Sequence, residues 1–290
     1  MAVAKATKAT AVANVLEFDQ EKIRANEMAV DRETDQEILA RLDERFEILT
    51  EMTRAVKSGD VRAMIVSGPP GVGKSYGVEE VLSKDDLFDT LGNRKPKYEI
   101  VKGAMSALGL YAKLYEFSDA KNVIVFDDCD SVLMDELSLN ILKGALDSSK
   151  KRFIAWNTDS RLLRSEGIPD RFEFKGAAIF ITNIKFEHVR SKKLKDHLDA
   201  LESRCHYIDL QMDTEREKIL RIKQVVSTGG MLDSYEFEQC VKDEIVEFID
   251  ANKAKLRELS LRMVLKIADL RKSFPRNWMA MAKTTCMKRV

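Results

Sequence analysis

The sequence has no net charge, no clustered cysteines and no long apolar run. Its 290 residues include 48 Lys and Arg and 48 Asp and Glu. No overall positive field therefore attracts nucleic acid, and such binding would need local patches. The four cysteines lie far apart without a C-x-x-C pair. This spacing argues against a zinc site or a disulfide framework and is typical of a protein in a reducing cytosol.

Membrane association and export are also not indicated. No apolar run approaches the ~20 residues that span a bilayer, and the N-terminus lacks the apolar core of a signal peptide. We therefore expect a cytoplasmic protein with no membrane partner. The length is sufficient to bury a sizeable core, either in one large domain or in two smaller ones.

The most informative feature that is present is a phosphate-binding loop pattern. Residues 61–75 read VRAMIVSGPPGVGKS, which contains G-x-x-x-x-G-K-[ST] between a predicted buried strand and a predicted helix. Glycines let backbone N–H groups turn toward a polyphosphate, and a helix N-terminus adds a favourable dipole. The candidate nucleotide-binding residues are Gly68, Pro69, Pro70, Gly71, Val72, Gly73, Lys74, Ser75 and Tyr76.

Two side chains of this loop have predicted roles of their own. Lys74 is expected to reach the β- and γ-phosphates, and the Ser75 hydroxyl is expected to bind the Mg²⁺ that bridges them. The alternative is a chance Gly-rich turn, which would have to match the four specified positions of an eight-residue pattern and both flanking elements. The sequence therefore predicts a nucleotide and metal site.

A second motif, NVIVFDDCD at residues 122–130, predicts a strand that ends in two carboxylates. In a parallel sheet they lie at the same edge as the phosphate loop. Asp127 is expected to bind Mg²⁺, and Asp128 to orient and polarise the water that attacks the γ-phosphate. Solvated loop acids explain many such pairs, but the position about 50 residues after an intact phosphate loop favours the functional interpretation.

The remaining pattern predicts two domains after a mobile tail. An amphipathic helix precedes the first strand, and further strands at 98–101, 123–126 and 178–182 alternate with helical stretches, as in a parallel sheet covered on both faces. From about residue 212 the pattern is wholly helical. Its signals are a Thr214 and Glu217 capping box, a helix end at Gly229 and Gly230, and helix starts at Ser234 and Ser260. The expected domains are a flexible tail at 1–30, a nucleotide-binding α/β domain at 31–210, and a helical lid domain with a basic tail at 211–290.

With these motifs in this order, the chain resembles the AAA+ ATPases over about residues 30–275. The resemblance implies ATP and Mg²⁺ as cofactors, ATP hydrolysis, and a three-layer α/β/α P-loop domain with a small helical lid. It also implies that Asn183 contacts the γ-phosphate and the attacking water. Many AAA+ proteins have Glu where this chain has Asp128, whereas replication initiators of the family have Asp-Asp, and the shorter side chain is consistent with slow hydrolysis.

The resemblance further implies two arginine roles. LESRC at 201–205 looks like the Ser-Arg-Cys motif of clamp-loader subunits, in which Arg204 would reach the nucleotide of the neighbouring subunit. Arg190 is the second candidate for that role, and Arg262, in a segment similar to the lid helix of the family, would sense the bound nucleotide. The alternatives are helix caps for Asn183 and Arg204, and an ordinary exposed side chain for Arg262.

The substrate is less clearly indicated. Strand-like RFIAW and RFEFKG at 152–156 and 171–176 predict a hairpin similar to the pore hairpin of DNA-translocating AAA+ proteins. Its cations and one aromatic ring could contact phosphates and a base, or the hairpin could pack on its own domain with Trp156 in its core. The residues in question are Lys150, Lys151, Arg152, Arg161, Arg164, Lys175 and Trp156.

Protein remodelling is the main alternative to work on DNA. AAA+ unfoldases grip polypeptide with an aromatic residue in the loop after the second strand, whereas this chain has Val101, Lys102 and Gly103 there. The C-terminal segment 271–290 has six basic and no acidic residues, but such runs are usually only solvated. The favoured prediction is a homo-oligomer, a hexameric ring or an open arc, that remodels, loads on or translocates DNA. A protein client or a nucleotide-dependent switch is the alternative.

Overall fold

The computed structural model describes residues 32–84 and 96–289, so the predicted tail at 1–30 lies outside the described residues. Two compact units are present. One is Glu44–Gln211, and the other combines the described residues up to Asp43 with those from Met212 onward. Within the described ranges, no helix combines the length and apolarity that crossing a bilayer requires.

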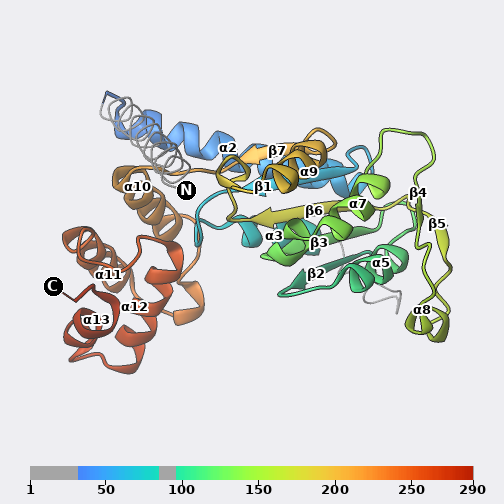
Figure 1. Ribbon diagram of the computed structural model, residues 1–290. Coiled ribbons are helices and arrows are strands. Elements are labelled where there is room, and N and C mark those ends of the chain that lie inside the picture. The colour runs from blue at the N-terminus through green and yellow to red at the C-terminus, as the bar shows by residue number, and fades with distance from the viewer. Residues whose placement is uncertain (1–31, 85–95, 290) are drawn as a thin grey trace, which may run out of the picture. The chain divides into compact units, whose positions relative to one another are not determined.

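The unit Glu44–Gln211 is built on a parallel sheet whose strand order is β2-β3-β6-β1-β7 within the described residues (Figure 1). Helices cover both of its faces, so β1, β3 and β6 are buried along their whole length. The fifth strand, β7, lies at the edge and was not predicted. The strands are β1 Ala63–Ser67, β2 Tyr98–Lys102, β3 Val123–Asp127, β6 Ala177–Thr182 and β7 His206–Asp209.

Alternate side chains of each strand enter two separate cores. Ile65 and Phe126 pack with α5, α7 and α9 on one face, whereas Met64 and Val66 pack with α2 and α3 on the other. The helices are α2 Asp35–Ser58, α3 Lys74–Ser83, α5 Ala107–Glu116, α7 Glu136–Ala145 and α9 Lys192–Glu202. The prediction of a three-layer α/β/α fold with a helical C-terminal part is confirmed.

Between α7 and β6 the chain forms the predicted hairpin. β4 Phe153–Ala155 pairs antiparallel with β5 Arg171–Glu173, and Ile154 lies opposite Phe172. The connection contains a short helix, α8 Arg161–Ser165. Two further short elements complete this unit, α6 Asp130–Met134 and η1 Phe186–His188.

The other unit is helical from Met212 onward. The Thr214 and Glu217 capping box at the start of α10 is confirmed, as is the cap of α12 by Ser260. The helix start at Ser234 was wrong, because Glu236 adopts a left-handed conformation with φ 58° and α11 begins only after it. The elements are α10 Glu215–Ser227, η2 Asp233–Tyr235, α11 Gln239–Ala251, α12 Leu261–Ser273 and α13 Trp278–Cys286.

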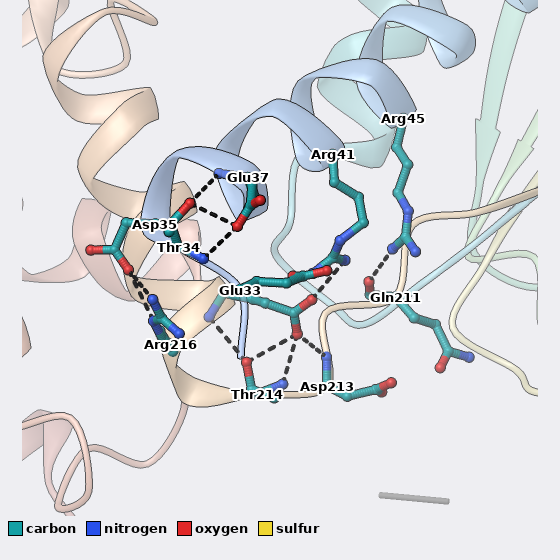
Figure 2. A network of polar contacts seen from close by, with 11 residues as sticks. Glu33, Thr34, Asp35, Glu37, Arg41, Arg45, Gln211, Asp213, Thr214 and Arg216 are labelled. Atoms are coloured by element: carbon teal, nitrogen blue, oxygen red, sulfur yellow. Dashed lines mark hydrogen bonds and ion pairs between the residues drawn. The ribbon is translucent and has the colours of Figure 1, made fainter. Parts of the chain in front are cut away.

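A buried carboxylate, Glu217, joins α10 to the beginning of α2 within this unit. Figure 2 labels its partners Arg41, Asp213 and Thr214. Glu217 is 3% exposed. Its Oε1 accepts a hydrogen bond from Arg41 Nη1 at 3.0 Å, and its Oε2 accepts three more from the backbone of Asp213 and from the backbone and hydroxyl of Thr214. Arg41 also donates from Nη2 to Glu33 at 2.7 Å. All charges of this network therefore have partners, as burial requires.

These hydrogen bonds determine the ionisation of Glu217. Burial by itself would raise the pKa of this carboxyl, but the hydrogen bonds from Thr214 and Arg41 outweigh it and hold the pKa below its ordinary value. A carboxyl whose pKa is lower in the folded state stabilises that state above its unfolded pKa, and the contribution is lost as the pH falls through the folded pKa.

We predict that Glu217→Gln lowers the free energy of unfolding at pH 7 by about 1.5–3 kcal/mol, the range for hydrogen bonds to a charged group. The deficit should begin to shrink as the pH falls below the ordinary pKa of a Glu carboxyl, about 4.3, and should be lost as the pH falls through the lower pKa of the folded state. Urea unfolding at pH 7 and pH 3.5 measures both values. The matched control is Glu215→Gln on the same helix, which removes an exposed charge. An equal deficit at both pH values would contradict the assignment.

Candidate nucleotide site

The phosphate loop connects β1 to α3, and its glycines meet specific geometric needs. A Cβ atom on Gly68 would lie 3.0 Å from the carbonyl oxygen of Leu210, so the close approach of these two segments excludes a side chain. Gly73 precedes α3 in a left-handed conformation with φ 104°, which other residues rarely adopt. The loop can therefore turn its backbone tightly at the N-terminus of α3, where helix geometry favours an anion.

The side chain of Lys74 lies under this loop and is enclosed by oxygen atoms. The residue is 6% exposed. Its Nζ donates to the carbonyl oxygens of Gly68 at 2.6 Å and Pro69 at 2.9 Å, and to Oδ1 of Asn183 at 2.6 Å. Because an ammonium group is costly to bury without partners, these bonds tie the loop to the end of β6.

Asn183 continues the connection to the acidic motif. Its Nδ2 donates to Oδ1 of Asp128 at 2.8 Å, so Lys74, Asn183 and Asp128 form one chain of hydrogen bonds. The turn that presents Asn183 is held by buried Thr182, whose hydroxyl accepts from the Ile184 backbone and donates to Asp130. The three residues meet because β1, β6 and β3 are neighbours and end at the same edge of the sheet.

Asp128 has an unusual backbone. It is one of the few described non-glycine residues with a positive φ, at 52°, and its N–H donates to the carbonyl oxygen of Ile181 at 3.0 Å. Asp and Asn tolerate this left-handed conformation better than most residues. The turn exposes the Asp128 side chain, whereas Asp127 before it stays 5% exposed. Adjacent carboxylates thus face different surroundings.

Ser75 and Asp127 form the pair of oxygen donors suited to a metal ion. The Ser75 hydroxyl donates to Oδ1 of Asp127 at 2.8 Å. Among the described residues no group of three or more His, Cys, Asp or Glu side chains could enclose a metal. Mg²⁺ commonly takes one or two carboxylates together with substrate phosphates and water. The donor set therefore fits Mg²⁺ that arrives with a polyphosphate.

One site residue was missed by the sequence reasoning. Lys102 ends β2 opposite Asp127 in the β2·β3 register, and its Nζ lies 3.5 Å from Oδ2 of that carboxylate. From the sequence, Lys102 is expected only at the place where unfoldases carry a substrate-gripping loop. A cation at the end of a strand that neighbours the acidic strand is the signal that could have indicated this contact.

Arg204 does not lie at this edge of the sheet. Arg204 follows α9 and precedes β7, which runs parallel to β1. It therefore lies at the opposite end of the strands, roughly 13–17 Å along the sheet for four or five residues. Arg190 precedes α9, and Arg262 lies on α12 in the other compact unit. Arg204 donates to the carbonyl oxygen of Ala200. The site of one chain is thus assembled without Arg204.

The hairpin is anchored to its own unit. Trp156 is half-buried and packs against Tyr111, with ring centroids 5.7 Å apart. Arg152 is buried and donates to the carbonyl oxygens of Ala145 and Gly176, so its proposed contact with nucleic acid is wrong. Burial also lowers the pKa of Arg152 to about 10. Arg164 pairs with Asp159, whereas Arg161 is exposed.

Sequence comparison identifies a relative of this chain in a bacteriophage. The chain is 32% identical over 249 residues to an uncharacterized 36.7 kDa protein encoded in the nrdC-mobD intergenic region of Enterobacteria phage T4, covering 85% of this chain and 75% of that protein. The chain belongs to the family of this phage T4 protein. No protein-family model matches the chain.

Among solved structures, the chain is similar to NtrX from Brucella abortus in complex with ATP. The TM-score is 0.49 and the identity is 11%, and the match covers 87% of this chain and 53% of NtrX. The chain is also similar to domain III of the replication initiation protein DnaA from Thermotoga maritima (TM-score 0.46, 11%, 84% and 91%) and to the Hsp104:casein complex of S. cerevisiae (0.46, 15%, 80% and 37%). The P-loop assignment rests on the chain's own phosphate loop and sheet.

Proposed function

We propose that the chain is an AAA+ ATPase that binds ATP with Mg²⁺, hydrolyses it at the interface between subunits of a ring or arc, and couples hydrolysis to work on DNA. One observation carries the proposal. The hydrogen-bonded chain from Lys74 through Asn183 to Asp128 connects the phosphate loop to the acidic motif, beside the Ser75 and Asp127 pair.

Each side chain has a role that follows from its position. Loop N–H groups and Lys74 would bind the phosphate oxygens. Ser75 and Asp127 would hold Mg²⁺, which neutralises charge on the phosphates when bound. Asp128, exposed at the same edge, would accept a hydrogen bond from the attacking water and take its proton. Asn183 would keep the Asp128 carboxylate oriented through their 2.8 Å hydrogen bond.

Arg204 would act in the site of another subunit. Its position at the far end of β7 keeps it away from the Lys74 of its own chain. A guanidinium supplied from a neighbour stabilises the negative charge that spreads over the transferring phosphoryl group, and can contribute ~10³–10⁵ in rate. We infer that two copies are needed to complete one catalytic site.

The proposal of work on DNA has its support in the hairpin connection and the end of β2. Lys150, Lys151, Arg161 and Lys175 are exposed around the hairpin and could contact phosphates. The end of β2 carries Lys102 in place of an aromatic residue, and Lys102 is directed to Asp127. This is not the arrangement expected for a loop that grips polypeptide side chains.

We predict that Lys74→Ala weakens binding of a fluorescent ATP analogue by at least ~100-fold, because the phosphates lose their buried cation. Lys84→Ala, near the end of the same helix, removes an exposed lysine that pairs with Glu80 and is the matched control.

Asp128→Asn should retain binding and lower turnover by ~10²–10⁴, the usual contribution of a general base. Normal turnover in Asp128→Asn would contradict the role of Asp128.

We predict that Arg204→Ala still binds ATP but loses turnover by ~10³ or more. Mixing it with Asp128→Asn should restore part of the activity, because some interfaces then combine an intact Asp128 with an intact Arg204. Phosphate release across a series of mixing ratios measures this rescue. Arg190→Ala tests the second candidate for this role, and near-normal turnover is expected of it if Arg204 is the residue that acts between subunits. Absence of rescue would reject a residue acting between subunits.

We predict that single-stranded or duplex DNA stimulates ATP turnover of the wild-type chain several-fold, whereas an unfolded protein substrate does not. The assay compares phosphate release with each addition and with none, at one ATP and Mg²⁺ concentration. Stimulation by unfolded protein alone would replace DNA with a polypeptide client. Turnover that no polymer changes would favour a nucleotide-dependent switch.

A further inference from the structure

Two short segments of the helical unit meet in an extended pairing outside its helices. Leu256 and Met287 form an isolated antiparallel bridge. The N–H of Arg257 donates to the carbonyl oxygen of Cys286, and the N–H of Lys288 donates to that of Lys255, both at 2.9 Å. The loop after α11 is thereby fastened to the residues that follow α13. We call residues 255–257 with 288–289 the basic ribbon.

The apolar side chain of the ribbon is buried, whereas its charged side chains are exposed. Leu256 is 2% exposed and belongs to the core of the helical unit. Because side chains alternate along an extended segment, its neighbours Lys255 and Arg257 point away from that core. Lys255, Arg257, Lys288 and Arg289 are all exposed. The outer face of the ribbon therefore presents positive charge only, without an exposed apolar side chain.

None of these four cations has an acidic partner among the described residues. Lys223 and Lys253 both pair with Asp250, and Lys266 pairs with Glu258. On the ribbon, by contrast, Lys255 and Lys288 lie across from each other in the pairing. Like charges in directly opposite positions repel, and nothing in the described chain neutralises them. A fold that keeps this repulsion is suited to an external anion.

We propose that the basic ribbon binds the phosphate backbone of a nucleic acid. Residues two apart on an extended segment are separated by ~6.6–6.8 Å, a spacing on the scale of neighbouring phosphates in a nucleic-acid strand. Lys255 and Arg257 can therefore contact one strand while Lys288 contacts the same phosphates from across the ribbon. Lys283, in the last turn of α13, extends the positive surface. Binding of this kind reads no sequence.

The chemistry favours a nucleic acid over a membrane surface. Binding in a bilayer interface uses apolar side chains that insert beside the charged ones, and the apolar residue between Lys255 and Arg257 is buried in the core. This inference goes beyond the proposed ATPase, because the ribbon lies outside the Glu44–Gln211 unit and needs no nucleotide to form. It supplies a holding contact for DNA that is separate from the hairpin.

The experiment compares the full chain with the variant Lys255→Ala/Arg257→Ala/Lys288→Ala. A fluorescent 20-base-pair duplex and the corresponding single strand are titrated without nucleotide at several KCl concentrations. The slope of log affinity against log salt should become less steep by about 3 for the duplex, at ~0.9 for each lost phosphate contact. The matched control is Lys223→Ala/Lys253→Ala/Lys266→Ala, which removes three paired cations and should keep nearly the wild-type slope.

Thermal unfolding of both triple variants establishes that they are folded, and Lys74→Ala provides a chain whose ATP site is disabled. Retained duplex binding in Lys74→Ala, with the reduced slope in the ribbon variant, supports the proposal even if the ATPase proposal fails. An unchanged salt slope in the ribbon variant overturns the proposal. An equal reduction of the salt slope in the control variant also overturns it. Binding to vesicles of anionic phospholipid, with none to either DNA, also overturns it in favour of a membrane.

Discussion

The site is organised around the buried ammonium group of Lys74. A cation that is 6% exposed needs oxygen partners, and the chain supplies them from the phosphate loop and from the end of β6. This requirement holds Asn183 in place, and Asn183 in turn holds Asp128. A single electrostatic need therefore connects three neighbouring strands at the edge where a triphosphate would bind. Loss of the charge would release the whole edge, which is more than the loss of one contact.

The two compact units satisfy buried charge in the same manner. In each, a buried ionic side chain is surrounded by backbone partners, Lys74 in one unit and Glu217 in the other. Several exposed cations of the helical unit pair with carboxylates, whereas those of the basic ribbon have no such partner among the described residues. The proposed ATP chemistry and the proposed grip on nucleic acid thus use separate surfaces, and mutations can separate them.

Much of the fold was predictable because its signals are local. Wholly apolar runs indicated β1, β3 and β6, and the phosphate-loop pattern located its own strand and helix. β7 was missed because only Ile208 of its four residues is buried, so this edge strand has no apolar run. The late start of α11 depends on the backbone of Glu236, which no side-chain pattern reveals. From the sequence, Arg152 was predicted to be a surface cation. Its burial could not be predicted, because its partners, the carbonyl oxygens of Ala145 and Gly176, come close only when the hairpin has folded.

The contacts of the site residues also differ in whether local sequence signals predict them. Lys74, Ser75 and Asp127 belong to a motif with fixed spacing, and their proximity follows from strands that end at a common edge. The contact of Lys102 with Asp127 depends on the order β2-β3 and on their register, which the sequence does not state. Both oxygens of the Asp127 carboxylate consequently already have partners, Ser75 on one and Lys102 on the other. A divalent ion held by Ser75 and Asp127 would meet the ammonium group of Lys102 at the same carboxylate, so its binding would be in competition with a cation at the tip of β2.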